Sequence, residues 1–205
     1  RFSEDGFARA VAAVGHPVLM VGIPLYSDLP KDHDYIVQAR GAFDETVRGI
    51  LALKRAGVRV EVRFVIHRET VPRMVEFARF VARNLTFVDH VALMGLEPIG
   101  FARTNLERLW VDPLDYQRPL CDATLALHRA GMSVSLYNHQ LCVLDPRLHP
   151  FARKSISDWK NSYFEECGAC GARDACGGFF ASSVARRSRG IRPLTSRSAS
   201  VTPRL

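Results

Sequence analysis

The sequence predicts an α/β protein in which a partial barrel of parallel strands precedes a small cysteine-rich module. Residues 1–131 alternate strand-like and helix-like segments three times, which is typical of a parallel sheet covered by helices. The alternation stops after Gly131, and three of the five cysteines then fall within ten residues near the C-terminus. We therefore expect a barrel unit at 1–131, a metal-binding module at 132–194 and a disordered basic tail at 195–205.

The first β/α unit begins with the apolar run at 18–23, Val-Leu-Met-Val-Gly-Ile. Such a run without polar alternation is typical of a strand buried on both faces. Residues 34–56 follow with apolar side chains at helical spacing, and Gly57 provides a stop signal. This unit therefore reads as one buried strand and one long helix.

The second unit begins with a strand at 58–67 that alternates apolar and mostly polar residues, and Thr70 can cap the helix that follows. Its polar face carries Arg59, Glu61, Arg63 and His67. A closed barrel fills its interior with branched apolar side chains, so charges there need water, a ligand or each other. The pattern indicates either an open or partial barrel around a polar cavity or, with equal weight, a solvent-facing edge strand.

The third unit has a strand at 87–94 that ends in Gly95-Leu-Glu97-Pro, and a helical segment at 112–131. Barrels of this class place ligand-binding groups at the carboxyl ends of their strands. Glu97 is therefore a candidate ligand-binding acid, although an ordinary loop carboxylate explains it as well. The predicted cofactor-binding residues are Arg63, His67, Gly95 and Glu97.

A different pattern follows Gly131. Residues 132–137 and 140–144 flank Asn138-His139, and this spacing predicts a β-hairpin because Asn tolerates a positive φ. A short helix is expected through Phe151, Ile156 and Trp159, before the cysteine loop. A module of this size buries little apolar surface and would need a metal to hold it.

The cysteine loop has the spacing C-x2-C-x5-C, with glycines that let the backbone fold closely around a metal. Its thiols belong to Cys167, Cys170 and Cys176, and Cys142 is the candidate fourth ligand. Either an iron–sulfur cluster or a zinc ion fits these donors. His139 or His149 could complete a Cys3His zinc site instead, with less support from position. Cys121 lies among apolar helical residues and reads as a packing residue.

Composition narrows the functional class. The chain is 47% hydrophobic and 24% charged, as in soluble globular proteins, and no apolar run reaches the roughly 20 residues of a membrane span. The odd cysteine count fits a reducing, cytoplasmic compartment. Residues 186–205 contribute six of the seven net positive charges but no aromatic side chain, so nucleic acid is not expected as a partner. No motif of hydrolytic chemistry stands out.

The sequence also resembles the His-Xaa-Ser system radical S-adenosylmethionine (SAM) maturases, in particular their C member. The likeness spans nearly all of residues 10–194, and the segment with the cysteines and Trp159 is its most specific part. The segments that carry it are 34–47, 88–97, 137–145, 151–161, 167–182 and 189–194.

The resemblance implies a radical SAM enzyme that modifies a ribosomally made precursor peptide with His-Xaa-Ser repeats, with a sister maturase as a possible partner. It implies the second half of a partial (β/α)6 barrel, followed by an auxiliary-cluster module. The strand ends would face SAM and the substrate. The implied ligands of an auxiliary [4Fe–4S] cluster are Cys142, Cys167, Cys170 and Cys176.

One feature of that family is absent from the sequence. Its catalytic cluster needs a C-x3-C-x2-C loop, which leaves one iron open to SAM, and these 205 residues contain none. We therefore expect this chain to be a piece of a longer enzyme and to be inactive alone. The alternative hypothesis is a zinc-stabilised module that binds a peptide or a nucleic acid without catalysis.

Overall fold

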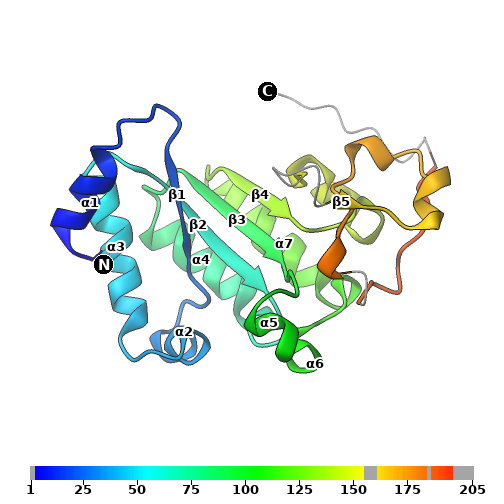
Figure 1. Cartoon of the computed structure of the whole chain (residues 1–205), viewed down its shortest axis with the longest axis horizontal. Helices are drawn as coiled ribbons and strands as arrows, with labels where there is room; N and C mark the ends of the chain where they lie inside the picture. Colours follow the sequence, from blue (N-terminus) through cyan, green and yellow to red (C-terminus); the bar gives the residue numbers. More distant parts are fainter. Residues whose placement is uncertain (1–2, 155–160, 184–185, 196–205) are drawn as a thin grey trace.

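A computed structural model describes residues 3–154, 161–183 and 186–195 of the chain. Its centre is a four-stranded parallel sheet in the spatial order β1-β2-β3-β4, which is also the chain order (Figure 1). The strands are β1 (Met20–Pro24), β2 (Arg59–Ile66), β3 (His90–Gly95) and β4 (Val134–Tyr137). Sequential parallel strands joined by helices are the arrangement of an open or partial barrel, so the predicted α/β class is confirmed.

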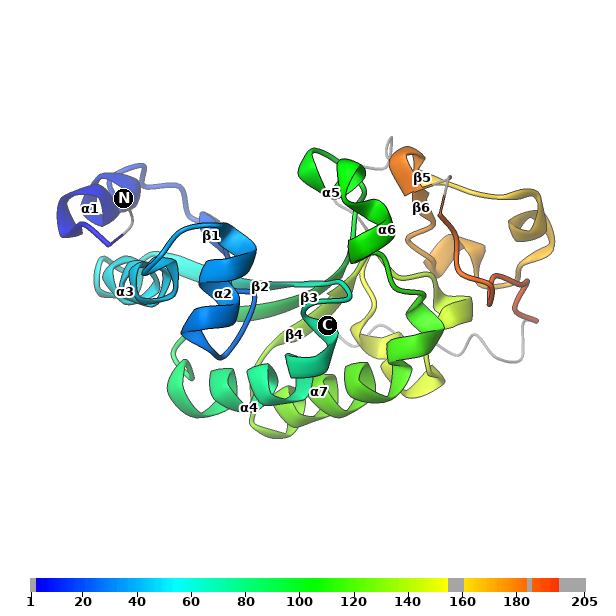
Figure 2. The ribbon, with the colours of Figure 1, turned by 90° about the horizontal axis from the view of Figure 1, so that it is seen from below.

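Helices connect each strand to the next. The first connection contains α2 (Pro30–Val37) and α3 (Ala42–Arg55), and α1 (Asp5–Ala12) precedes the sheet. The second contains α4 (Met74–Asn84), after the short 3-10 turn η1 (Val71–Arg73). The third contains α5 (Phe101–Thr104), α6 (Leu106–Leu109), the 3-10 turn η2 (Pro113–Tyr116) and α7 (Gln117–Arg129). Figure 2 shows α4 and α7 along one face of the sheet, with α5 and α6 on the opposite side. None of the helices in the described residues is long and apolar enough to cross a bilayer.

The hydrophobic core lies between the sheet and the helices α4 and α7. Strand β2 points Val60, Val62, Phe64 and Ile66 toward this core, and all four are fully buried. The Phe64 ring packs against Phe77 of α4 with centroids 4.3 Å apart. The opposite side of β2 carries the charged residues, as the alternation predicts. Because β2 pairs with both β1 and β3, it is an inner strand, and the edge-strand alternative is wrong.

The predicted helix over 34–56 is two helices, because the chain turns between them. Gln38 and Gly41 have φ angles of 61° and 77°, which no α-helix contains. The Asp34 carboxylate accepts hydrogen bonds from the backbone N–H groups of Gly41 (2.6 Å) and Phe43 (2.9 Å). It thereby satisfies free N–H groups at the start of α3, which makes the break stable.

The predicted hairpin after Gly131 is wrong. Val134–Tyr137 is the fourth strand of the main sheet and pairs in parallel with β3, whereas Leu141–Val143 forms a 3-10 turn, η3. Asn138 does have a positive φ, 63°, but it ends β4 instead of joining two antiparallel strands. A strand of the main sheet therefore leads directly into the cysteine-bearing part of the chain.

The described parts of 141–195 contain short turns and one small antiparallel ladder. The ladder pairs β5 (Asn161–Ser162) with β6 (Phe179–Phe180). The 3-10 turns after η3 are η4 (Pro146–Phe151), η6 (Glu165–Ala169), η7 (Arg173–Ala175) and η8 (Ala181–Ser183). Of the expected short helix, Phe151 is the last residue of η4 and Ala152 is extended, whereas Ile156 and Trp159 lie outside the described residues. The predicted disordered tail likewise lies outside them from residue 196 onward.

Candidate functional site

A large cleft opens at the carboxyl ends of β1, β2 and β3. Its volume is about 1060 Å³, and we call it the strand-end cleft. The four residues predicted to bind a cofactor, Arg63, His67, Gly95 and Glu97, all line it. The carboxyl end of a parallel sheet gathers side chains from separate connections, which is why residues far apart in sequence meet here.

His67 is the most unusual group in this cleft. Its side chain is buried, and its Nδ1 has no hydrogen-bond partner among the described residues. Its backbone N–H donates to Thr70 Oγ1 (2.9 Å), which fixes the turn after β2. Burial lowers the pKa of His67 to about 4, so the imidazole is neutral near pH 7. A buried nitrogen without a partner costs about 1–3 kcal/mol, which a hydrogen bond to a ligand would offset.

Arg63 is held by its neighbours on the polar face of the sheet. Its Nε donates to Glu61 Oε1 at 2.6 Å, and Glu61 is buried. The guanidinium lies over Gly22 of β1, where a Cβ would collide with it. The charges predicted on this face are therefore neutralised partly by each other. About half of the Arg63 side chain remains exposed toward the cleft, so it can still meet an anionic group.

Gly95 and Glu97 have different roles at the end of β3. A Cβ on Gly95 would lie 2.7 Å from the Asn138 carbonyl oxygen, and Asn138 Nδ2 donates to the Gly95 carbonyl at 3.0 Å. The glycine therefore serves close packing against the end of β4. The Glu97 side chain is half-buried and has no ion pair within the described part of the chain.

The rim of the cleft was not predicted from the sequence. It carries exposed apolar side chains from α2 on one side and from the region of α5 on the other. These side chains are Tyr35, Val37, Ile99 and Phe101. Phe101 is 90% exposed, which is unusual for a large aromatic residue. Arg108 joins the two sides, because it pairs with Glu69 (3.1 Å) and also lies over the Tyr35 ring.

A second cavity is lined by all four predicted metal ligands, and we call it the cysteine cavity. Cys142 comes from η3, and Cys167, Cys170 and Cys176 come from the loop around η6 and η7. The cavity has a volume of about 20 Å³, above the roughly 10–15 Å³ that one water needs, so the thiols surround a void. Burial raises the pKa of Cys142 and of Cys176, and the neighbouring thiols raise both further.

Backbone N–H groups point at two of these sulfurs. Gly178 donates to Cys176 Sγ at 3.4 Å, and Leu194 donates to Cys170 Sγ at 3.3 Å. Cys121 is buried in α7, as the packing interpretation predicted, and does not line the cavity. The chain thus brings together four of its five cysteines and sets the fifth apart.

The two candidate histidine ligands are not brought to the cysteines. His139 is buried, its Nε2 lies 3.1 Å from the Tyr116 hydroxyl, and its Nδ1 lies 2.8 Å from the Tyr137 carbonyl oxygen. His149 Nε2 contacts the Leu141 carbonyl oxygen at 3.0 Å. Neither histidine lines the cysteine cavity. Within the described residues no three His, Cys, Asp or Glu side chains stand close enough to hold a single metal ion.

A third cavity, of about 50 Å³, shares lining residues with both of the others. It shares Gly95 and Asn138 with the strand-end cleft, and Gln140 and Phe179 with the cysteine cavity. Gln140 Nε2 also donates to the Gly178 carbonyl at 2.8 Å, which fixes the last turn of the cysteine loop. The end of β4 therefore borders all three cavities.

Comparisons with known proteins agree with the architecture. Neither the protein-family models nor the curated proteins compared with this sequence gave a match. The crystal structure of SuiB from Streptococcus suis superposes with a TM-score of 0.50 at 11% identity, over 67% of this chain. The chain spans only 31% of the SuiB chain. A radical SAM methyltransferase from Sphaerobacter thermophilus gives a TM-score of 0.47 at 15% identity, over 69% of this chain and 40% of that one.

At 11% identity the likeness to SuiB concerns the fold and not the chemistry. The four parallel strands and their helices therefore form an α/β fold that is similar to part of the SuiB structure.

Proposed function

We propose that this chain is part of a radical SAM enzyme that modifies a ribosomally made peptide of the His-Xaa-Ser type. SAM and the peptide would occupy the strand-end cleft, and an auxiliary [4Fe–4S] cluster would bind at the cysteine cavity. The observation that carries the proposal is that Cys142 lines one cavity together with Cys167, Cys170 and Cys176. This cavity lies next to the end of the four-stranded parallel sheet. A sister maturase remains a proposed partner on the strength of the sequence resemblance.

The residues around the cysteine cavity fit an iron–sulfur cluster. The donors are four thiols, the set that such clusters use, and N–H groups already point at two of the sulfurs. Arg173 and Arg192 also line the cavity and would offset the negative charge of a thiolate-bound cluster. A single zinc ion would need tightly converging thiolates, because Zn–S bonds are about 2.3 Å long, and the described residues contain no such group.

When bound, a cluster with four protein thiolates supplies one-electron transfer but no open iron site. Generation of the radical would therefore depend on a C-x3-C-x2-C loop, which these 205 residues do not contain. The raised thiol pKa values of Cys142 and Cys176 mean that protons must leave these groups when metal binds. Loading should accordingly become weaker as the pH falls.

The strand-end cleft fits a polar ligand together with a peptide. It offers the Nδ1 of His67, which has no partner among the described residues, and the half-exposed guanidinium of Arg63. Its apolar rim offers contacts for peptide side chains through Tyr35 and Phe101, on opposite sides of the opening. The volume of about 1060 Å³ reaches the upper end of the range for small-molecule sites, about 300–1,000 Å³, which leaves room for more than one ligand.

Anaerobic reconstitution with ferrous iron and sulfide tests the cluster assignment. The wild-type chain should turn brown, absorb broadly near about 400 nm and retain iron and sulfide in near-equal amounts. Cys142→Ala should lose this retention. Cys121→Ala is the matched control, because it removes a thiol that does not line the cavity, and it should retain iron like the wild type.

Each other outcome contradicts a definite part of the proposal. A colourless protein that binds one zinc ion per chain would support the zinc-stabilised module instead. Iron retention that is equal in Cys142→Ala and in the wild type would remove Cys142 from the ligand set. The peptide part is tested separately, by fluorescence anisotropy of a labelled His-Xaa-Ser repeat peptide with the wild type and with Phe101→Ala. Equal binding by both proteins would rule out the apolar rim as the peptide site.

A further inference from the structure

The segment at 186–195, which we call the strap, runs from the connection after β3 to the cysteine cavity. Its first residues contact that connection, where Arg186 pairs with Glu107 and lies over the Trp110 ring. Arg187 pairs with Glu166 at 3.0 Å, at the start of the cysteine loop. The strap therefore touches both the barrel part of the chain and the cysteine-bearing part.

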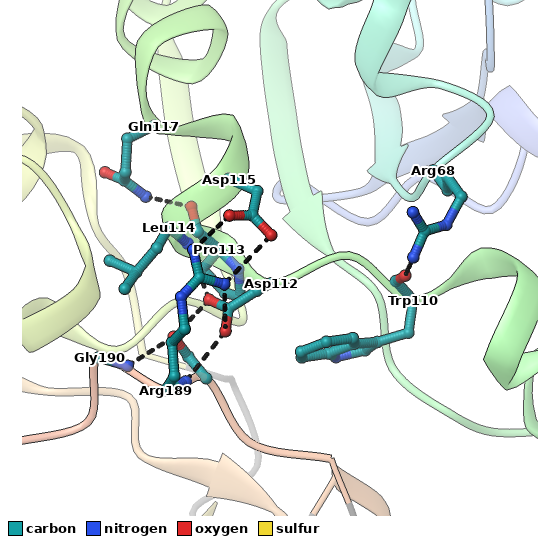
Figure 3. Close-up of polar contacts among 10 residues, drawn as sticks. Arg68, Trp110, Asp112, Pro113, Leu114, Asp115, Gln117, Arg189 and Gly190 are labelled. Carbon is teal, nitrogen blue, oxygen red and sulfur yellow. Dashed lines mark hydrogen bonds and ion pairs between the residues drawn. The ribbon is translucent and has the colours of Figure 1, made fainter.

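One buried carboxylate holds the strap on the barrel side. Asp112, of which only 4% is exposed, accepts a hydrogen bond from Ser188 Oγ at 2.6 Å and one from the Arg189 backbone N–H at 2.9 Å. It also accepts the Leu114 N–H at 2.9 Å and so caps η2. Figure 3 shows the strap residues meeting Asp112 and Asp115 beneath the start of η2. Burial alone would raise the pKa of Asp112, but these hydrogen bonds outweigh it and lower the pKa.

Two further contacts fit the strap closely to this loop. Gly190 packs against the Leu114 side chain, where a Cβ would lie 2.8 Å from Leu114 Cδ1. The Gly190 N–H donates to Ser188 Oγ at 3.1 Å, so the hydroxyl links Asp112 to the next turn of the strap. The Asp112 carboxylate is thus the point on which the strap's hydrogen bonds converge.

The other end of the strap lines the cysteine cavity. Leu194 donates its N–H to Cys170 Sγ, and its carbonyl accepts the Gly171 N–H at 2.8 Å. Arg192 and Leu194 both line the cavity. The same short segment therefore donates to a sulfur of the cysteine loop and lines the cavity that also includes Cys142.

We propose that Asp112 is a positioning residue for the cysteine site, because it fixes the strap so that the Leu194 N–H reaches Cys170 Sγ. The inference rests on the proposed function, since it concerns thiolates that would hold the cluster. Hydrogen bonds to cluster sulfurs are one of the levers that set reduction potential. Asp112 would therefore influence both metal retention and potential without touching the metal.

Asp115 provides the matched control. It also pairs with Arg189, but half of its side chain is exposed, and 60% of the Arg189 side chain is exposed. Exposed ion pairs of this kind contribute little to stability, whereas hydrogen bonds to a buried charged group contribute more. The two aspartates thus lie three residues apart and contact the same strap, and only Asp112 anchors it from a buried position.

The experiment compares Asp112→Asn with Asp115→Asn in the full 205-residue chain. After reconstitution, Asp112→Asn should lose iron to a chelator roughly tenfold faster than the wild type and show a more negative midpoint potential. Hydrogen exchange at the Leu194 and Gly171 amides should also accelerate roughly tenfold in metal-free protein. Asp115→Asn should stay within about twofold of the wild type in all of these measurements.

Ser188→Ala keeps the inference testable if Asp112→Asn does not fold, because it removes a strap contact and leaves the η2 cap in place. It should accelerate exchange at Leu194 by several-fold. If Ser188→Ala and any folded Asp112→Asn match Asp115→Asn in exchange and iron loss, the inference is overturned and the cluster assignment survives. If the wild type takes up no iron, the proposed function fails, and the exchange data on metal-free protein still decide whether Asp112 fixes the strap.

Discussion

Replacing Gly95 with alanine tests whether the end of β3 is held against the end of β4 by backbone contact. The added Cβ would lie 2.7 Å from the Asn138 carbonyl oxygen, which is too close for carbon and oxygen. The same shift would strain the hydrogen bond from Asn138 Nδ2 to the Gly95 carbonyl. Overpacking costs about 1–3 kcal/mol and a lost hydrogen bond about 1 kcal/mol, so the free energy of unfolding should fall by about 2–4 kcal/mol.

Gly22→Ala is the matched control for this change. Gly22 also lies in a strand, but its Cβ would meet the Arg63 guanidinium, the far end of a flexible side chain that can move aside. We therefore expect the free energy of unfolding of Gly22→Ala to fall by no more than about 1 kcal/mol. Part of this loss is offset because alanine lowers the entropy of the unfolded chain. Urea unfolding followed by far-UV circular dichroism gives both values, provided that the m-value is unchanged. Equal losses in the two variants would refute the backbone-contact argument.

Two further predictions concern stability. Burial lowers the pKa of His67 and of His139 to about 4, so between about pH 6.5 and 4 the unfolded chain binds more protons than the folded chain. The free energy of unfolding should therefore fall as the pH drops through this window, by up to about 3 kcal/mol per histidine. Measured by urea unfolding, it should depend less on pH in His139→Gln than in the wild type. Phe64→Ala should lower the free energy of unfolding by about 3–5 kcal/mol, because the Phe64 ring is fully buried. Phe101→Ala should change it by no more than about 0.5 kcal/mol, because Phe101 is exposed. Similar melting temperatures for the two variants would contradict the described core.

Much of the sheet could be predicted because its signals are local. The alternation at 58–67 distinguishes the face of β2 that packs on α4 from the face with Glu61 and Arg63, and the structure separates the same two sets. The cysteines were also accessible to sequence reasoning, because C-x2-C-x5-C spacing limits where thiols can go. What spacing could not supply was the position of Cys142, which depends on the turn that follows β4.

The misread elements depend on contacts between distant residues. The segment at 132–137 has the pattern of any short strand, and only its pairing with β3 shows that it belongs to the sheet. The break between α2 and α3 depends on the side chain of Asp34, which mimics a backbone acceptor seven residues before Gly41. The hydrogen bond that anchors the strap joins Ser188 to Asp112, 76 positions earlier in the chain. Neither segment contains a sequence motif that predicts this contact.

The turn after β4 explains why two such different sites lie beside each other. Asn138 faces the strand-end cleft and binds the Gly95 carbonyl, while Gln140, two residues later, binds Gly178 in the cysteine loop. Cys142 follows after two more residues, so its thiol is positioned by the last strand of the sheet and not by the loop that supplies the other three. A change at the end of β4 should therefore alter the cleft and the cysteine cavity together. The strap fixed by Asp112 forms a second, independent connection between the same two parts, and disturbing it should affect the cysteine cavity while leaving the floor of the cleft in place.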